Sequence, residues 1–166
     1  DAIHIEQDIL KENVGCQDQV MAAFGGFNRI SFSGECDIDI RRVTVKPERL
    51  ELLQNHLMLV FTGFSRMASE IAGEQIKQTP NRKRELSEMH RMVDEAIDIL
   101  NGDSDINEFG KLLHESWQLK RSLTDKISTP YTDFLYDGAM KDGATGGKIL
   151  GAGGGGFMVF FVKPEL

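Results

Sequence analysis

The sequence predicts an α+β fold, in which antiparallel strands are separated along the chain by a block of helices. Apolar runs typical of strands occur early and again at the C-terminus, whereas the middle of the chain carries apolar stripes with helical spacing. Strands and helices that are grouped in this way, rather than alternating regularly, are typical of the α+β class. We therefore expect an antiparallel sheet covered by several helices.

The first third of the chain predicts one helix and two strands. Residues 2–13 have their apolar side chains on one helical face, and the sequence after them, up to residue 15, is a helix-stop signal. Residues 15–19 are then expected to form a polar turn. Strands are predicted at 28–33 and around 38–45, with Arg41 and Arg42 on an exposed face or in a bulge of the second strand.

The remaining elements follow from apolar periodicity and from helix-start and helix-stop residues. A continuous apolar run at 56–61 predicts a strand buried on both faces, and residues 157–162 predict the last strand. Ser104 is expected to cap one of the helices. Helices are predicted from residue 46 through Leu53, at about 65–78, from about Leu86 to Leu100, at 104–123 and at 130–141, with Pro80 breaking the chain after the second of these.

Composition and charge limit the classes of function. The chain has 166 residues, of which 40% are hydrophobic and 27% charged, and this suits one globular domain or one and a part. A net charge of -7 without a long basic run argues against nucleic-acid binding. Because there is neither a membrane-length apolar run nor a visible signal peptide, we expect a cytoplasmic protein with no membrane partner. Cys16 and Cys36 are expected to be reduced, and the scattered His residues do not suggest a zinc site.

The most informative stretch is residues 146–157, in which seven of twelve residues are Gly. Gly151 to Gly156 fits the spacing G-x-G-x-x-G, but a dinucleotide fingerprint needs a following helix, and here a predicted strand follows. A Walker loop is excluded because no Gly-Lys-Ser/Thr ends the stretch. Two interpretations stay open: a glycine-rich hairpin that only permits tight packing, or a wall that lies against a nucleotide or a sugar phosphate.

A few polar side chains are candidates for chemistry. Asp18 lies between Gln17 and Gln19 and is either a turn-forming residue or a carboxylate presented for catalysis. Lys148, inside the glycine-rich stretch, is either a phosphate-binding charge or a surface residue at a strand edge. Thr62, Ser65 and Arg66 follow a predicted strand and open a helix, so they either bind an anion or merely cap the helix and face solvent.

Several segments together resemble the C-terminal part of a GHMP-family small-molecule kinase. The resemblance covers essentially all 166 residues and rests on segments that occur in the family's order, including Gly15-Cys16-Gln17-Asp18-Gln19 and the glycine-rich stretch. The segments between them that contribute are 22–28, 61–66 and 115–120. The chain opens at Asp1 directly into a helical pattern, which fits a cut inside a longer protein. The resemblance implies that residues 1–45 end an N-terminal domain and that 46–166 form the C-terminal domain.

The resemblance also implies roles for individual residues. Asp18 would be the catalytic carboxylate, and Glu6, twelve residues before it, would help to hold Mg²⁺, although a surface Glu is an equal alternative. The resemblance implies that the glycine-rich loop supports the family's nucleotide phosphate-binding loop and borders the substrate, through Gly151, Ala152, Gly153, Gly154, Gly155 and Gly156. The candidates for substrate binding are Gln17, Thr62, Gly63, Ser65, Arg66 and Lys148.

The implied function is phosphoryl transfer from ATP, with Mg²⁺, to a sugar or sugar phosphate. The resemblance makes D-glycero-D-manno-heptose 7-phosphate the first choice of substrate. Arg66 favours a phosphorylated sugar, because it would meet a phosphate that is already present. Kinases for fucose, galactose or an isoprenoid precursor are alternatives, as is a binding module without catalysis. The family's N-terminal phosphate-binding loop does not occur in this sequence, so we expect the fragment alone to be inactive. An incomplete sheet with an exposed edge would permit a homodimer.

Overall fold

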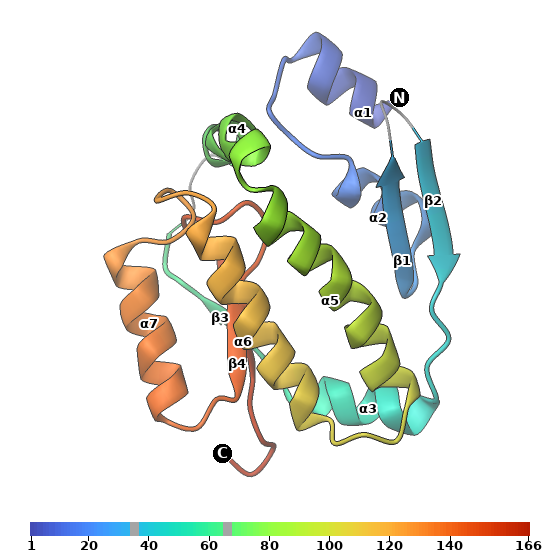
Figure 1. Ribbon diagram of the computed structural model, residues 1–166, viewed down its shortest axis with the longest axis vertical. Helices are drawn as coiled ribbons and strands as arrows, with labels where there is room; N and C mark the ends of the chain where they lie inside the picture. The colour runs from blue at the N-terminus through green and yellow to red at the C-terminus, as the bar shows by residue number, and fades with distance from the viewer. Residues whose placement is uncertain (34–36, 65–67) are drawn as a thin grey trace. The chain divides into compact units, whose positions relative to one another are not determined.

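The computed structural model describes residues 1–33, 37–64 and 68–166. The chain divides into two compact units, Asp1–Val45 and Lys46–Leu166, and each is described by itself (Figure 1). Both units combine helices with antiparallel strands, so the predicted α+β class is confirmed. Within the described ranges no helix is both long and apolar enough to cross a membrane.

The first unit begins with a short α1, Ala2–His4, which continues as a π-helical segment η1, Ile5–Ile9. The predicted helix over 2–13 is therefore too long: regular structure stops after residue 9, and Lys11 has a positive φ of 56°. The apolar spacing correctly placed a helical segment at the start of the chain. It could not place the end, because the stop signal in the sequence lies at Gly15, whereas the helix ends before Lys11, which takes a backbone angle that is rare for its type.

The next helix, α2, spans Gln17–Phe24 and replaces the polar turn that the sequence predicted at 15–19. Two strands follow, β1 (Asn28–Ser33) and β2 (Asp37–Arg42), which pair antiparallel in the regular register Asn28↔Arg42 to Ser33↔Asp37. The bounds of β1 were predicted correctly, whereas β2 is shorter than predicted. Arg41 and Arg42 are exposed in regular register, so the exposed-face alternative holds and the bulge does not.

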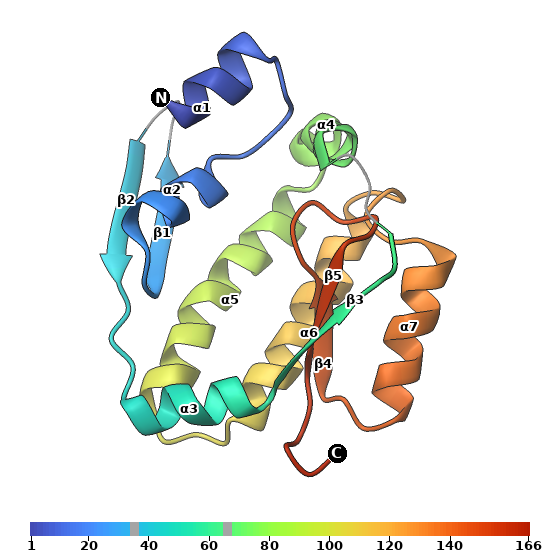
Figure 2. The same cartoon turned by 180° about the vertical axis from the view of Figure 1, so that it is seen from behind.

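In the second unit, a helix and a strand come first, a run of helices follows, and two strands come last. The order is α3 (Pro47–Asn55), β3 (Leu57–Phe61), α4 (Ala68–Gln78), a 3₁₀ turn η2 (Thr79–Asn81), α5 (Lys83–Asn101), α6 (Asn107–Ser122), α7 (Pro130–Lys141), β4 (Gly146–Ile149) and β5 (Phe157–Phe161). Among the described residues, the strands of this unit form an antiparallel sheet in the order β3-β5-β4, and Figure 2 shows these strands in front of the helices. The predicted insertion of helices between an early strand and the final pair is therefore confirmed.

Strand β3 differs from its prediction as a strand buried on both faces. Leu57, Met58, Leu59 and Phe61 are between 40% and 59% exposed. In the described part of the sheet, β3 is an edge strand that pairs with β5. Its Val60 side chain packs against the main core. A continuous apolar run predicts burial only when a second layer covers the strand, and the run itself carries no information on that layer.

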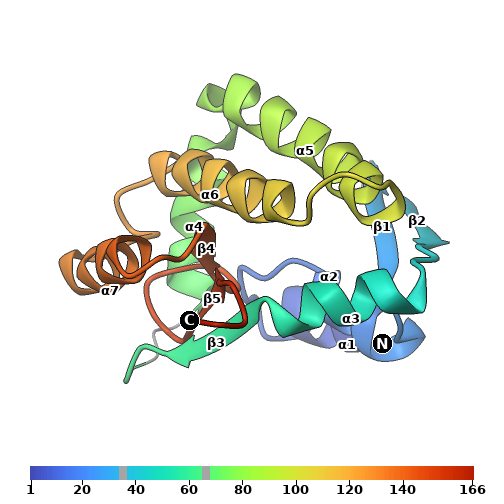
Figure 3. The same cartoon turned by 90° about the horizontal axis from the view of Figure 1, so that it is seen from below.

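The main core lies between the sheet and the helices α4, α6 and α7. Trp117 of α6, Tyr136 of α7 and Phe160 of β5 are at most 2% exposed and pack together. Figure 3 shows α6 between α5 and the sheet. Helix α6 and strand β4 approach each other closely at Gly110 and Gly146. A Cβ added to Gly146 would lie only 1.9 Å from the carbonyl oxygen of Gly110, so no larger residue fits there. This approach holds β4, and with it the start of the glycine-rich loop, against α6.

Helices α6 and α7 differ in how well their first residues were predicted from side-chain caps. The prediction of Ser104 as a cap is wrong, because α6 begins at Asn107, whose backbone N–H donates to the Asp105 carboxylate over 3.0 Å. Helix α7 has the predicted bounds, and Thr129 and Thr132 form a reciprocal capping box at its start. A capping residue followed by Pro130 is a strong local start signal, which explains why this helix was placed correctly.

Candidate phosphate-binding loop

The glycine-rich loop connects β4 to β5 and is fixed at both ends by backbone hydrogen bonds. Leu150 N–H donates to the Phe157 carbonyl over 2.8 Å and closes the base of the loop. At the far end, Thr62 donates to the Gly156 carbonyl twice, from its N–H over 2.8 Å and from its hydroxyl over 2.9 Å. Gly156 N–H in turn donates to the Phe64 carbonyl over 2.8 Å. The segment after β3 therefore holds the loop in one place.

The middle of the loop is held mainly through its carbonyl groups. The Gln75 amide of α4 donates to the Ala152 carbonyl over 2.7 Å, and the Lys120 ammonium of α6 donates to the Gly151 carbonyl. Gly154 N–H donates to the Ile127 carbonyl over 2.8 Å. Gly153 has a φ of +120°, and a Cβ there would lie 2.8 Å from the same Ile127 carbonyl oxygen. Only Gly suits that position, both for its backbone angle and for its space.

Other backbone donors of the loop are left without a partner. Within 1–33, 37–64 and 68–166, the N–H groups of Gly151, Ala152 and Gly155 have no hydrogen-bond acceptor. A Cβ added to Gly151 would have nothing within 4 Å, so this part of the loop borders open space. Backbone N–H groups that border open space can donate to an anion that approaches the main chain closely. The loop therefore has the chemistry expected of a phosphate-binding wall.

Two lysines lie beside this loop, Lys120 on α6 and Lys148 on β4. Both are partly buried, and burial lowers the pKa of each ammonium group. The pKa of Lys120 falls to about 8, first because of burial and second because of the positive charge of Lys148. In the described part of the chain, neither lysine forms an ion pair with a carboxylate, and the ammonium group of Lys148 makes no hydrogen bond. Two poorly hydrated cations without a counter-ion favour the binding of an anion.

The segment after β3 was predicted to bind substrate. Thr62 is buried, 2% exposed, and its hydroxyl also donates to the Phe64 carbonyl over 3.1 Å, so its hydrogen-bonding capacity serves the loop. Gly63 is exposed with a φ of +88°. Ser65 and Arg66, the other two predicted residues here, lie outside the described residues. Their roles, and a substrate contact by Gly63, stay predictions.

In the first unit, Asp18 and Gln17 lie in the first turn of α2 and are both exposed. Among the described residues, neither side chain has a hydrogen-bond or ion-pair partner, so the Asp18 carboxylate is not bonded to its own backbone. Glu6 lies on η1, and its carboxylate accepts a hydrogen bond from the Gln19 side-chain amide of α2. That bond connects the two helical segments that carry the predicted catalytic and metal-binding residues.

Mg²⁺ is bound in kinases by one or two carboxylates together with substrate phosphates and water. Glu6 and Asp18 offer oxygen ligands of the right kind on neighbouring parts of the first unit. The residues described contain no group of three or more His, Cys, Asp or Glu side chains that would hold a metal by themselves. This donor set fits an ion that is held mainly by nucleotide phosphates rather than a metal centre built by the protein.

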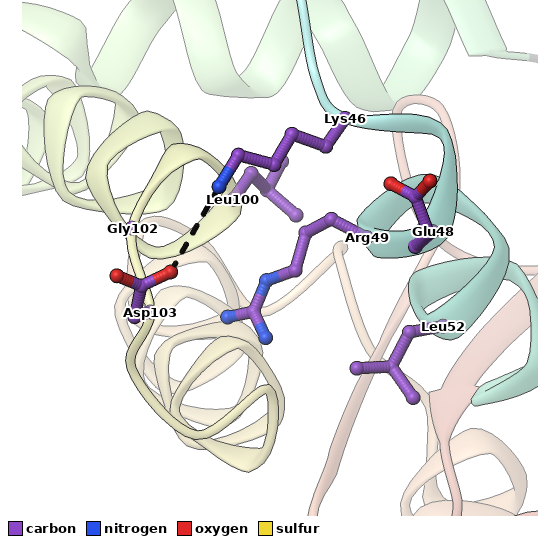
Figure 4. Close-up of a pocket in the computed structure, with 7 residues that line it drawn as sticks. All are labelled: Lys46, Glu48, Arg49, Leu52, Leu100, Gly102 and Asp103. Atoms are coloured by element: carbon purple, nitrogen blue, oxygen red, sulfur yellow. Dashed lines mark ion pairs between the residues drawn. The ribbon is translucent and has the colours of Figure 1, made fainter.

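A surface pocket of about 280 Å³ is unrelated to this loop (Figure 4). It lies where α3 meets the end of α5 and is lined by Lys46, Glu48, Arg49, Leu52, Leu100, Gly102 and Asp103. The Arg49 guanidinium donates to the carbonyls of Ile99 and Ser104, over 2.8 and 2.6 Å, and so caps the C-terminal end of α5. Lys46 reaches Asp103 only at 4.0 Å between exposed side chains. The charged groups here hold two helices together, and we assign the pocket a structural role.

Lys120 and Gln75 contact the loop but were not among the residues predicted from the sequence. A signal for Lys120 was present: it follows the buried Trp117 by three residues and therefore lies on the apolar stripe of α6. A lysine on a buried stripe is unusual unless a partner or ligand explains it. Gln75 carried no such signal, because an amide on an amphipathic helix has no preferred partner that the sequence could reveal.

Comparison with known proteins gives consistent matches. The family model described as GHMP kinases C terminal matches residues 95–166. The D-glycero-alpha-D-manno-heptose 7-phosphate kinase of Campylobacter jejuni is 32% identical over 165 residues, which are 98% of this chain and 48% of that protein. The bifunctional fucokinase/GDP-fucose pyrophosphorylase of Arabidopsis thaliana is 26% identical over 158 residues, 90% of this chain and 14% of that protein.

A solved structure supports the same relationship. The crystal structure of a D-glycero-D-manno-heptose 1-phosphate kinase from Bacteroides thetaiotaomicron superposes with a TM-score of 0.60 at 27% identity, and the match covers 99% of this chain and 43% of that one. The chain thus spans about half the length of the heptose kinases that it matches, and a smaller part of the bifunctional enzyme. The similarity extends over nearly all of the chain, including both units.

Proposed function

The chain belongs to the GHMP kinase family, whose C-terminal domain it contains, and we propose that it is the C-terminal portion of an ATP-dependent sugar kinase. The proposed substrate is a sugar phosphate, with D-glycero-D-manno-heptose 7-phosphate as the first choice. The observation that carries this proposal is the similarity to a heptose 7-phosphate kinase over 98% of the chain. We also propose that residues 1–45 end the N-terminal domain and that 46–166 are the C-terminal domain, a division at the same position as that of the two compact units.

In this proposal the glycine-rich loop lies against phosphate groups. Its fixed ends, its unpartnered N–H groups and the open space at Gly151 support that role. The loop needs little rearrangement to bind, because Thr62, Gln75 and Lys120 already hold its carbonyl groups. Phosphoryl transfer depends mainly on positioning and on compensation of charge, and both require such a fixed wall.

Asp18 is proposed as the catalytic carboxylate. Its exposed side chain has no partner in the described residues and is therefore available to accept a hydrogen bond from a substrate hydroxyl and to take up its proton. Gln17, exposed beside it, is proposed to contact the substrate, and Glu6 to contribute one oxygen ligand to Mg²⁺. When bound, ATP supplies the phosphoryl group and Mg²⁺ offsets the negative charge of its phosphates.

A kinase for another sugar is the second candidate, and the similarity to a fucokinase over 90% of the chain favours it. A panel of heptose 7-phosphate, fucose, galactose and mannose separates the two when ATP consumption is measured with the full-length protein. Selective turnover of heptose 7-phosphate is expected. Turnover of fucose or galactose instead would replace the proposed substrate, and ligand binding without any turnover would favour a non-catalytic module.

The same assay tests Asp18. The Asp18→Asn variant should lose at least about two orders of magnitude of turnover, because a general base contributes about 10²–10⁴-fold. Asp125→Asn, which alters an exposed carboxylate on a loop of the second unit, is the matched control and should keep full activity.

We also expect the 166-residue chain by itself to consume no ATP. The proposed homodimer through a sheet edge is tested by the molar mass of this chain in solution.

A further inference from the structure

We propose that Lys120 and Lys148 together form the cationic part of a subsite for a terminal phosphate group, with the N–H groups of Gly151 and Ala152 as its neutral donors. The inference rests on the proposed function in one respect, namely that the anion is a phosphate. It adds a residue, Lys120, that neither the sequence nor the similarity to known kinases had identified. The source of the phosphate is either the sugar substrate or the nucleotide.

Among the described residues, the two positive charges of this site have no negatively charged partner. Lys120 comes from the last turns of α6, where it donates to the Gly151 carbonyl, and Lys148 lies on β4, the strand that leads into Gly151. Burial lowers the pKa of both groups, and the charge of Lys148 lowers that of Lys120 further. In the residues described, no carboxylate forms an ion pair with either of them. This arrangement destabilises the folded chain unless an anion occupies the site.

The loop directs its carbonyl groups and its N–H groups to different sides. The carbonyl groups of Gly151 and Ala152 accept hydrogen bonds from Lys120 and Gln75, so they are directed toward the protein. The N–H groups of the same two residues have no acceptor in the described ranges, and the position of a Cβ on Gly151 is open. Lys120 therefore contacts the loop at the residue where an anion would find free donors.

The charge of the site indicates the class of ligand. A phosphate monoester carries about -1.5 to -2 charges near pH 7, whereas a carboxylate carries only one. Two ammonium groups and two N–H donors match the charge and the several acceptor oxygens of a phosphate dianion better than those of a carboxylate. The ligand class is therefore a terminal phosphate, as in a sugar phosphate or at the end of a nucleoside triphosphate.

A purely structural role for Lys120 is the competing explanation, because its ammonium group already donates to the Gly151 carbonyl. The two roles differ in what a phosphate does to the lysine. A bound dianion would replace the missing counter-charge and raise the pKa of Lys120 from about 8 toward its ordinary value. A lysine that only ties the loop would keep its pKa when phosphate is added.

The test uses the 166-residue chain with inorganic phosphate as the probe, followed by NMR of the loop amides and of the lysine Cε groups. We expect shifts at Gly151 and Ala152 and an upward shift of the Lys120 pKa on saturation. Lys120→Met and Lys148→Met should each weaken phosphate binding about ten-fold or more, the loss expected for one charge-assisted hydrogen bond. Lys120→Arg should stay within a few-fold, because it keeps the charge.

Lys141→Met is the matched control, since Lys141 is exposed at the end of α7. It should bind phosphate like the unaltered chain. The dispersion of the NMR spectrum shows whether each variant is folded. If Lys120→Met does not fold, Lys120→Arg still allows the test. The proposal is overturned if phosphate does not bind, if only Lys148→Met weakens binding, or if phosphate binds without moving the Lys120 pKa.

Two further arms identify the source of the phosphate. The same variants are titrated with ATP and with heptose 7-phosphate, and the ligand whose affinity drops in both lysine variants occupies the subsite. The kinase assay of the full-length protein is a separate measurement. Phosphate binding that depends on both lysines in a protein that phosphorylates no sugar would retain the subsite and reject the proposed function. Phosphorylation of a sugar by a protein whose phosphate binding does not depend on both lysines would reject the subsite and retain the proposed function.

Discussion

The two units of this chain differ in how their apolar side chains are used. Among the described residues of Asp1–Val45, Val20 is the buried apolar side chain, while Phe24 is 66% exposed. In Lys46–Leu166, Trp117 is 0% exposed at the centre of a core that involves three helices and the sheet. Tertiary packing therefore stabilises the second unit, whereas the first depends on local hydrogen bonds of its helices and hairpin.

The largest test of this difference replaces one large aromatic side chain in each unit. Trp117→Ala should lower the free energy of unfolding by about 3–5 kcal/mol, because it removes a fully buried ring and leaves a cavity. Phe24→Ala should change it by no more than about 0.5 kcal/mol, as expected for an exposed position. Urea denaturation followed by far-UV circular dichroism measures both.

Trp117→Phe serves as the control, since the buried indole N–H has no hydrogen-bond partner in the described residues and Phe keeps most of the ring. It should cost clearly less than Trp117→Ala. Equal losses for Trp117→Ala and Phe24→Ala would contradict the comparison, because they would mean that Phe24 belongs to a packed core as well.

The elements of the second unit could be predicted to the extent that their signals are local. Helix α7 was predicted with its observed bounds because Thr129 and Pro130 specify its start and its own periodicity specifies its length. Strand β3 was placed correctly but its burial was not, because burial depends on a layer that the run 56–61 does not encode. In the first unit the helix over 2–13 was overextended, since few tertiary contacts reinforce its local pattern.

The candidate site could be predicted in the same limited sense. The density of Gly at 151–156 predicted a loop between two strands, and the loop is there. Sequence spacing could not reveal that the side chains of Gln75 and Lys120 fix its carbonyls, because these contacts join residues that are 77 and 31 positions apart. Long-range contacts of this kind depend on the packing of α4 and α6, which no local pattern specifies.

The second test compares two glycines. Gly153→Ala in the loop should cost about 1–3 kcal/mol, because its φ of +120° strains any residue with a Cβ and the Ile127 carbonyl fills the space. Gly15→Ala in the first unit has nothing within 4 Å of the added Cβ and should be neutral or slightly stabilising. Thermal unfolding followed by the fluorescence of Trp117 measures both variants.

If Gly153→Ala were as stable as Gly15→Ala, the loop would have to adopt another backbone conformation in solution. Loop-amide NMR spectra of Gly153→Ala distinguish a rearranged loop from a locally strained one. A strained loop should keep the Gly154 hydrogen bond to Ile127, and the amide of Gly154 should then exchange slowly with solvent.

The third test concerns two threonines. Thr62→Val removes a buried hydroxyl that donates to the carbonyls of Phe64 and Gly156, but both carbonyls keep a backbone N–H donor. The expected loss is therefore modest, about 1 kcal/mol. Thr44→Val, at an exposed position of the first unit, should have no measurable effect in the same urea titration. A loss of similar size at both positions would show that the exchange of a hydroxyl for a methyl group, rather than the loss of these two hydrogen bonds, causes it.

The last test concerns the pH dependence of stability, which we expect to arise mainly from Lys120. Its pKa of about 8 in the folded chain lies below the ordinary value of 10.5, so the unfolded chain binds more protons between these pH values. The free energy of unfolding should therefore rise with pH above about 8. Burial raises the pKa of Tyr136 to about 12, which gives an opposite slope above pH 10 because the unfolded Tyr ionises first. The slope from Lys120 is thus measured below pH 10.

Replacing Lys120 by Met removes the group whose protonation is unfavourable, and the rise above pH 8 should become smaller. It should not vanish, since burial also lowers the pKa of Lys148. Lys11→Met in the first unit is the matched control, because Lys11 is exposed, and it should keep the profile of the unaltered chain. Saturating phosphate should also flatten the rise, since a bound dianion stabilises the charged lysines that the folded chain otherwise disfavours. An unchanged slope in Lys120→Met would mean that water reaches this ammonium group freely. The second unit would then not differ from the first by a buried lysine with a lowered pKa.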